Sequence, residues 1–194
     1  MKSWNGCDEK PAMIHQREKA EFYNLLMMPL SRNHILSLVS LVKQRPELIE
    51  WAIDLLKNGQ KAEAMKASWL LTHLWDAEQS FFIEIQNQII EVVLSTSDDS
   101  VRRNLLRMID GFNLSEDQQG MLFGPCLDWM VSEKYAVAVR ANAMQILYRI
   151  ALREPDLIPE LEQQISSLMD YSSAGIRSRG KKILSSFRKR LQSN

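Results

Sequence analysis

The sequence contains only two cysteines, Cys7 and Cys126, which lie far apart in the chain. They cannot build a framework of disulfide bonds or a zinc site with paired cysteines. The three histidines, His15, His34 and His73, are scattered and form no HExxH motif. The sequence therefore predicts no bound metal and no other cofactor. The scarcity of cysteine is typical of a protein in a reducing cytoplasm.

Long apolar runs are also absent, and none approaches the ~18 residues that a membrane-spanning helix needs. The first residues, MKSWNGCDEKPAM, carry Asp8, Glu9 and Lys10 where a signal peptide would have its apolar stretch. Apolar residues make up 45% of the chain and charged residues 25%, which is ordinary for a soluble protein. We therefore expect a cytoplasmic protein without a membrane segment, with residues 1–11 disordered and residues 12–194 forming one domain.

Motifs of enzymatic catalysis are missing as well. No GxSxG, GxGxxG or GxxxxGK[ST] occurs, so the usual nucleophile elbow and phosphate-binding loops are excluded. GMLFGP at residues 120–125 has two glycines but lacks the flanking strand that a phosphate-binding loop uses. Cys126 follows this segment among Phe123, Leu127 and Trp129, and we expect it to be a buried, unreactive thiol. The sequence thus predicts no enzyme.

A pattern of about 37 residues recurs along the chain. Four segments, AMKASWLL, SVRRNLLRMI, AVRANAMQIL and GIRSRGKKIL, align on the basic residues Lys66, Arg102, Arg140 and Arg177, at spacings of 36, 38 and 37. An apolar residue precedes each basic residue. In the last three segments another apolar residue follows seven positions later, about two turns of a helix. In the first segment, Thr72 and His73 interrupt this pattern.

Two proline-containing segments provide a second register. RPELIEW at residues 45–51 resembles EPDLIPE at residues 154–160, and their prolines lie 109 residues apart, close to three periods. Proline is favoured at the first position of a helix, so Pro46 and Pro155 are expected to begin the second helix of a pair. The predicted outer helices, called A helices here, cover 31–44, 60–77, 98–111, 135–153 and 173–191. The predicted inner helices, the B helices, cover 46–58, 81–95, 116–131 and 155–170, and a helix over 12–28 caps the first pair.

Several residues have the chemistry of helix ends. The expected N-terminal caps are Ser31, Asp98 or Asp99, Ser115 and Ser173. Gly59 is expected to end a helix in the left-handed conformation. Pro125 is expected to kink the helix over 116–131 rather than end it, because apolar residues continue beyond it.

Two helices per period of about 37 residues predict an α-solenoid. DDSVRR at residues 98–103 matches the D-x-x-V-R motif of the HEAT-repeat (armadillo-type) family, which the chain resembles over about 31–191. The segment SAGIRSRGKKIL is similar to the ending of small bacterial HEAT-like proteins. The resemblance implies an all-α, right-handed α-α superhelix of about four and a half helix pairs. Ala62, Ala136 and Ser173 replace the motif's Asp elsewhere, so a continuous Asp–Arg ladder between repeats is not expected.

The net charge is zero, but the charges separate between the two kinds of helix. The B helices hold twelve acidic residues and one basic residue, whereas the A helices hold seventeen basic and five acidic residues. The resemblance implies that B helices line the concave surface, which would then be acidic. Such a surface attracts a basic peptide or protein segment and repels phosphate backbones, although charged faces also serve solubility alone. The candidate partner-binding residues are Glu47, Glu50, Asp54, Glu84, Glu91, Asp128, Glu160 and Glu162.

A basic region supports an alternative function. From Gly175 onward the chain has seven basic residues and no acidic one, which suits either a solvated terminal repeat or contact with a nucleic acid. The candidate basic patch is Arg140, Arg177, Arg179, Lys181 and Lys182. Trp129 with Asp128 superficially resembles the aromatic and acidic residues of HEAT-like DNA-alkylation-repair glycosylases, but the acidic B helices oppose that reading.

The preferred interpretation is a non-enzymatic interaction or scaffold module that binds a protein or peptide, with a nucleic-acid-binding or DNA-alkylation-repair-like protein as the alternative. In the preferred case the acidic B helices carry the binding, and the partner segment is basic or polar. In the alternative, the basic patch carries it, and affinity for DNA or RNA falls steeply as the salt concentration rises.

Overall fold

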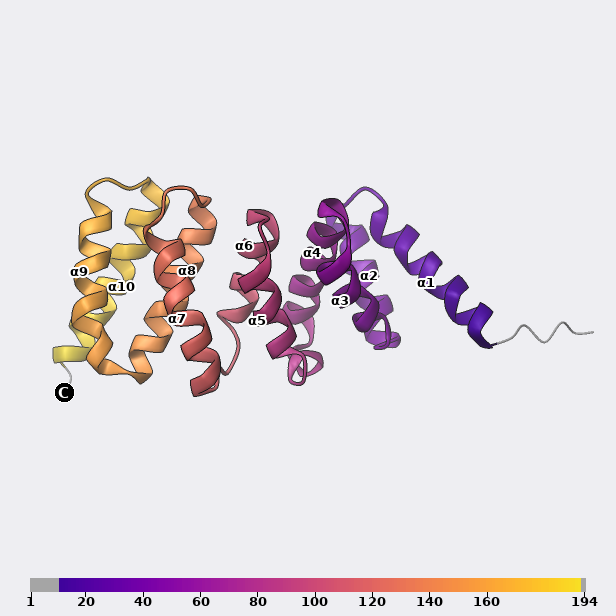
Figure 1. Ribbon diagram of the computed structural model, residues 1–194, viewed down its shortest axis with the longest axis horizontal. Helices are drawn as coiled ribbons and strands as arrows, with labels where there is room; N and C mark the ends of the chain where they lie inside the picture. The colour runs from indigo at the N-terminus through magenta and orange to yellow at the C-terminus, as the bar shows by residue number, and fades with distance from the viewer. Residues whose placement is uncertain (1–10, 193–194) are drawn as a thin grey trace, which may run out of the picture. The chain divides into compact units, whose positions relative to one another are not determined.

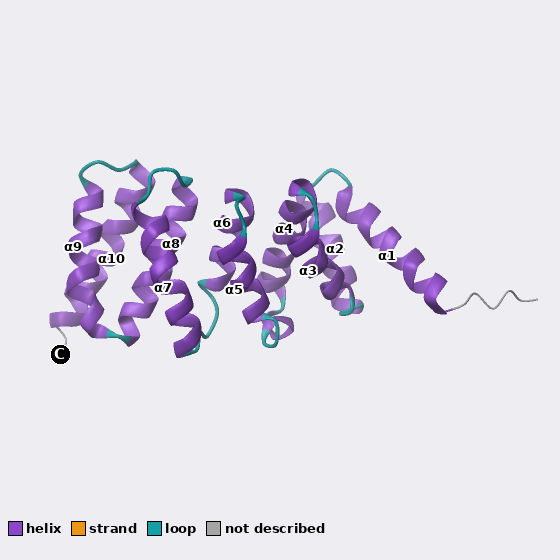
Figure 2. Ribbon diagram, in the orientation of Figure 1, coloured by secondary structure: helices purple, strands orange, loops and turns teal. Residues whose placement is uncertain are grey.

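A computed structural model describes residues 11–192, and this part of the chain is built from α-helices and short 3-10 turns with no β-strand (Figures 1 and 2). The elements are α1 (Pro11–Met27), α2 (Arg32–Gln44), α3 (Leu48–Asn58), α4 (Lys61–Ala77), η1 (Gln79–Phe82), α5 (Gln86–Ser95), α6 (Asp99–Ile109), α7 (Glu116–Val131), α8 (Val137–Arg153), η2 (Pro155–Leu157), α9 (Ile158–Met169) and α10 (Ala174–Gln192). The predicted all-α fold is confirmed. The disorder predicted for residues 1–11 concerns residues outside those described, except that Pro11 begins α1.

The chain divides between Glu78 and Gln79 into two compact units. In the N-terminal unit, α2 and α3 pack against α4, and α1 contacts both α3 and α4. In the C-terminal unit, α8 packs against α6 on one side and α10 on the other, so the three A helices form a row. The B helices α5, α7 and α9 pack against α6, α8 and α10 respectively, and α5 also contacts α7. The sequence predicted one domain over residues 12–194. The division into two units does not test whether they fold together, so this stays a prediction.

The repeat pattern corresponds to the core. The apolar residues that precede the aligned cations, Val101, Val139 and Ile176, are buried, and so are those seven positions beyond the cations, Ile109, Leu147 and Leu184. In the first repeat Thr72 is buried too, and its hydroxyl donates to the carbonyl oxygen of Ser68 at 2.7 Å. A polar side chain is tolerated at this core position because its own helix supplies the acceptor.

The helices pack in different pairs from those that the sequence-based prediction gave. α3 packs along α4 and α9 along α10, so Pro46 and Pro155 stand before the first helix of a packed pair rather than the second. Pro155 opens the 3-10 turn that leads into α9, as its missing N–H permits. The B helix predicted over 81–95 begins only at Gln86, because the preceding residues form η1 and a turn.

Most predicted helix ends are confirmed. The side chains of Ser31, Asp98 and Ser115 accept hydrogen bonds from the first backbone N–H groups of α2, α6 and α7. The prediction for Gly59 is wrong, since its φ is −73° and its backbone is extended. Glycine is needed there for space, because a Cβ atom would lie 2.4 Å from the carbonyl oxygen of Leu55. α7 continues through Pro125, as expected.

Candidate interaction surfaces

The predicted acidic residues are distributed over both units. Glu47, Glu50 and Asp54 lie at the start and along α3, Glu84 precedes α5, Glu91 lies on α5, Asp128 on α7, and Glu160 and Glu162 on α9. Six of these residues are exposed, and Glu47 among them is bonded to Arg45. The other five are open to a partner, namely Glu50, Glu84, Glu91, Asp128 and Glu160. With the observed boundaries, α3, α5, α7 and α9 contain eight acidic residues and one lysine, and the A helices seventeen basic and three acidic residues. The separation of charge by helix therefore persists in the structure.

Two of the predicted acidic residues are engaged within the N-terminal unit. Glu47 accepts a hydrogen bond from Arg45 Nε at 2.9 Å, and this bond is the main reason that the pKa of Glu47 is lowered. Asp54 accepts from Asn58 at 2.9 Å and pairs with Lys19 Nζ at 3.2 Å, and these contacts lower the pKa of Asp54 in that order. Asp54 links α3 to α1, whereas Glu47 is exposed and bonds locally to Arg45. Both carboxylates are therefore already engaged within the unit.

The aligned cations of the repeat have a structural role. Each donates to a main-chain carbonyl oxygen at or near the C-terminal end of a preceding helix: Lys66 to Met27 and Met28, Arg102 to Thr96, Arg140 to Met130, and Arg177 to Ser172. Such carbonyl groups lack hydrogen-bond donors within their own helix and carry partial negative charge. A cationic side chain there both donates a hydrogen bond and neutralises that charge. Arg102 and Arg140 are each only 6% exposed. Part of the positive charge of the A helices is therefore internal.

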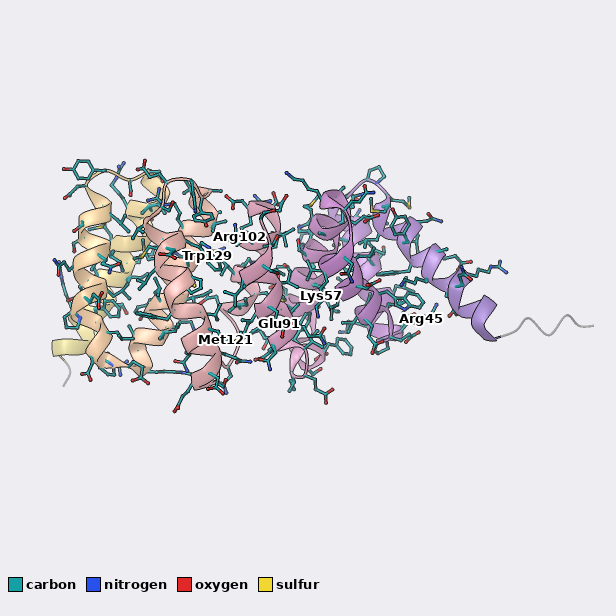
Figure 3. The ribbon with its side chains drawn as sticks, viewed as in Figure 1. Arg45, Lys57, Glu91, Arg102, Met121 and Trp129 are labelled. Atoms are coloured by element: carbon teal, nitrogen blue, oxygen red, sulfur yellow. The ribbon has the colours of Figure 1, made fainter. Side chains whose placement is uncertain are left out.

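Arg102 has the most extensive contacts of this set. Its Nη1 donates to Asp99 Oδ1 at 2.8 Å, and its guanidinium carbon lies 5.1 Å from the ring centroids of both Trp129 and Tyr135 (Figure 3). The other carboxylate oxygen of Asp99 accepts from the backbone N–H of Ala136 at 2.7 Å. Trp129 is only 5% exposed. It packs in the core against an arginine and is not presented to a nucleic acid.

The predicted basic patch is not one free surface. Arg140 is buried, with its Nε bonded to Met130 O at 3.1 Å. Arg179 is half-buried and donates to Gln145 Oε1 at 2.7 Å, and Arg177 donates to Ser172. Lys181 and Lys182 are exposed on α10.

A groove that the sequence-based prediction missed lies in the C-terminal unit. It has a volume of about 350 Å³. Its lining comprises Glu116, Gln119, Gly120, Phe123 and Gly124 of α7, Ile150 of α8, and Glu154 and Leu157 beside or within η2. A wider hollow of about 1130 Å³ shares Glu116, Gln119 and Glu154 with it and extends to Ile83, which is 70% exposed. We call the smaller cavity the α7 groove.

The signal for the α7 groove was present in GMLFGP. Gly120 and Gly124 are four positions apart, so they lie on one face of α7. Glycine within a helix is about 0.5–1 kcal/mol less favourable than alanine, and two of them on one face indicate a need for space rather than for a phosphate loop.

A family model described as a HEAT repeat domain matches residues 22–187. The chain belongs to the HEAT-repeat family. The stacked helices of each unit are those of a HEAT-like α-solenoid, as predicted. No curated protein matches the chain. HEAT repeats are generally protein-interaction or scaffold modules.

In this HEAT-repeat protein, varied polar contacts link neighbouring repeats instead of a continuous Asp–Arg ladder. They join residues 34 to 40 positions apart, close to the repeat period. In the C-terminal unit the pairs are Asp99 with Ala136, Arg103 with Asn142, Phe112 with Arg149, Asn113 and Leu114 with Arg153, Gln145 with Arg179, and Tyr148 with Ser186. Many of the acceptors are main-chain carbonyls, which any sequence supplies. That is why a fixed side-chain ladder is not visible in the sequence.

The remaining candidates for chemistry are structural. His34 Nε2 lies 2.8 Å from Leu25 O, and His73 Nδ1 lies 3.2 Å from Trp69 O. Cys126 is a free, buried thiol whose pKa is raised by desolvation, so it is a poor nucleophile. Among the side chains that the structure describes, residues 16–190, no three His, Cys, Asp or Glu gather as a metal site would require. No helix in this range is both long and apolar enough to cross a bilayer.

Proposed function

We propose that this HEAT-repeat protein is a non-enzymatic interaction module that holds a basic segment of a partner protein through the acidic side chains of its B helices. The observation that supports the proposal is the exposure of Glu50, Glu84, Glu91, Asp128 and Glu160 on, or directly before, helices that together carry one lysine. Each exposed ion pair with a partner contributes only ~0–1 kcal/mol. Several such pairs together speed association and select a partner segment of positive charge.

The test compares two variants with the same change in net charge. The first carries Glu91→Lys and Asp128→Lys on α5 and α7. The control carries Glu21→Lys and Glu133→Lys, both exposed but outside the B helices. Each protein is used for affinity purification from the native cell, followed by mass spectrometry. We expect the wild type and the control to retain the same partners and the first variant to lose them. An identical set of partners for all three proteins would contradict the proposal.

The nucleic-acid alternative rests on α10, whose described residues include seven cations and no carboxylate. Lys181 and Lys182 are exposed there. It predicts a complex with DNA or RNA at low salt that weakens steeply as salt rises, and that Lys181→Glu with Lys182→Glu weakens further. The burial of Arg140 and Trp129 favours the protein-binding function, because the residues that would grip a base or phosphate are used inside the repeat.

We further propose the cytoplasm as the site of action, since the buried Cys126 is a free thiol and suits a reducing compartment. Fractionation of the native cell with an antibody against the protein tests this. Recovery in a membrane or secreted fraction would contradict it.

A further inference from the structure

We infer that the α7 groove is the anchor site for a basic peptide segment of the partner, which inserts one large apolar side chain over Gly120 and Gly124. The inference rests on the proposed function, since it supplies the specific contact that exposed carboxylates alone do not provide. It specifies where on the protein the segment binds and that the segment needs one apolar residue. It also allows a test in which a larger side chain blocks the groove. The evidence is the shape of the groove, the nature of its lining and the charge around it.

The shape comes from two missing side chains. Apart from the neighbouring residues and the backbone of α7, an ideal Cβ atom placed on Gly120 or on Gly124 has no atom within 4 Å. By contrast, a Cβ on Gly180 of α10 would lie 3.0 Å from Ile165 and 3.1 Å from Met169, so that glycine is required for packing inside the protein. Gly120 and Gly124 are not needed for internal packing. They leave the backbone of α7 open to an approaching ligand.

The lining suits one apolar side chain. Phe123 and Leu157 are half-buried, and Ile150 is almost fully buried. The volume of about 350 Å³ is at the lower end of the ~300–1,000 Å³ range of small-molecule sites. A groove of this size can surround a side chain such as Phe or Leu, and burial of such an anchor is what usually dominates the affinity of a protein interface.

The charge around the groove selects a basic segment. Glu116 and Glu154 line it, and Asp117 lines the adjoining hollow. The cation that lines the hollow, Arg153, donates to Leu114 O at 2.5 Å and to Asn113 Oδ1 at 2.6 Å, so it is directed into the α6–α7 loop. Lysines or arginines on either side of the apolar anchor would meet these carboxylates, whereas an acidic or phosphorylated segment would be repelled.

The experiment uses the full chain and a fluorescent lysine-rich dodecapeptide with one central phenylalanine. Two matched peptides replace the phenylalanine by serine or all lysines by glutamate. Fluorescence anisotropy measures the Kd of each. We expect the phenylalanine peptide to bind, the serine peptide to bind about tenfold or more weakly, and the glutamate peptide not to bind. The difference between the first two isolates the anchor, since their charge is the same.

Gly120→Leu is the decisive variant, because Gly120 lines the groove and an ideal Cβ atom there meets no side chain. Gly124 is less suitable, because a Cβ atom in a helix directly before Pro125 is sterically disfavoured. Gly120→Leu also removes a helix-interior glycine, so its Tm is expected to be unchanged or higher. We expect it to weaken the phenylalanine peptide about tenfold or more and to have little effect on the serine peptide. Met121→Leu is the control, since Met121 is exposed on the same helix but is not among the lining residues (Figure 3). Glu116→Gln with Glu154→Gln is expected to weaken binding by a few-fold, most strongly at low salt.

The outcomes separate the groove from the broader function. Equal binding of the phenylalanine and serine peptides, or full binding to Gly120→Leu, would overturn the anchor site. If Glu91→Lys with Asp128→Lys then still weakened both peptides, the acidic B helices would remain the binding surface. Failure of the phenylalanine peptide to bind, or equal binding of the glutamate peptide, would also overturn the anchor site, and the partner capture above would then decide the proposed function alone. A dimer in sedimentation that Gly120→Leu dissociates would assign the groove to a second copy of this chain and overturn the peptide proposal.

Discussion

The guanidinium carbon of Arg102 lies 5.1 Å from the centroid of the Trp129 ring, on the face of an aromatic side chain that belongs to the next helix along the chain. The same group also lies 5.1 Å from the ring centroid of Tyr135, just before α8. Through Asp99 and Thr96 it also contacts α6 itself and the end of α5. The Arg of the D-x-x-V-R motif thus connects four successive elements of the C-terminal unit.

Replacing Arg102 by alanine is expected to lower the free energy of unfolding by about 3 kcal/mol, since it removes a largely buried ion pair, a helix-end contact and two cation–π contacts together. Arg102→Lys is expected to lose about 1–2 kcal/mol, because an ammonium group cannot reproduce the planar fork that donates to both Asp99 and Thr96 beside two aromatic rings. Urea unfolding followed by circular dichroism measures both. Arg103→Ala, an exposed neighbour, should change stability by less than about 0.5 kcal/mol. Equal effects at 102 and 103 would contradict the assignment.

Replacing glycine by alanine is expected to have opposite effects on stability in α7 and at residue 59. Gly120→Ala should raise the free energy of unfolding by about 0.5–1 kcal/mol, because the new methyl group meets no side chain and the unfolded chain loses freedom. Gly59→Ala should lower it by about 1–3 kcal/mol, since its methyl group would clash with the carbonyl of Leu55. Thermal and urea unfolding of the two variants compare them directly. Destabilisation by Gly120→Ala would show that the groove is filled from within the protein.

Glu63 predicts a pH dependence for the N-terminal unit. Its carboxylate accepts from Tyr23 Oη at 2.7 Å and from the backbone N–H of Gln60 at 2.6 Å, and the first of these bonds is the main cause of its lowered pKa. A folded-state pKa below the ordinary 4.5 means that the stabilisation is present above about pH 4.5 and is lost as the pH falls through the folded-state value.

We therefore expect Glu63→Gln to be less stable than the wild type at pH 7 and the difference to shrink toward pH 3. Urea midpoints at several pH values measure this. Glu21→Gln, which affects only an exposed pair with Arg17, serves as the control and should show no such convergence. A constant difference between Glu63→Gln and the wild type at all pH values would contradict the prediction.

We propose that residues 12–194 unfold as a single domain, because each helix of a solenoid depends on its neighbours for burial. Scanning calorimetry of the full chain should give one transition. Leu70→Ala and Leu147→Ala remove fully buried side chains from the N-terminal and C-terminal units, each at about 2–5 kcal/mol, and both should shift that same transition. Two transitions, each shifted by only one substitution, would instead make the two compact units independent.

The helical architecture could be predicted because local patterns determine it. Apolar residues at helical spacing, the capping side chains of Ser31, Asp98 and Ser115, and a recurring cation all lie within one or two repeats of sequence, and each was found where the pattern placed it. Errors occurred where a local pattern has two explanations. Gly59 follows the end of a helix, as predicted. Glycine is needed there because the carbonyl oxygen of Leu55 lies close to it, and not because the backbone is left-handed. Pro155, which opens the turn before α9, does not reveal with which neighbour that helix packs.

The amino-acid sequence by itself determined the all-α class, the period near 37 residues and the separation of acidic from basic helices, because these depend on residue spacing along one chain. Only the tertiary structure decided which charges are free. It buried Arg140 and Arg102 against carbonyl groups and aromatic rings, paired Asp54 with Lys19, and left Asp128 exposed. It also turned two glycines of α7 into the wall of a groove. Burial and open space depend on atoms brought together from distant parts of the chain, and spacing along the chain does not contain that information.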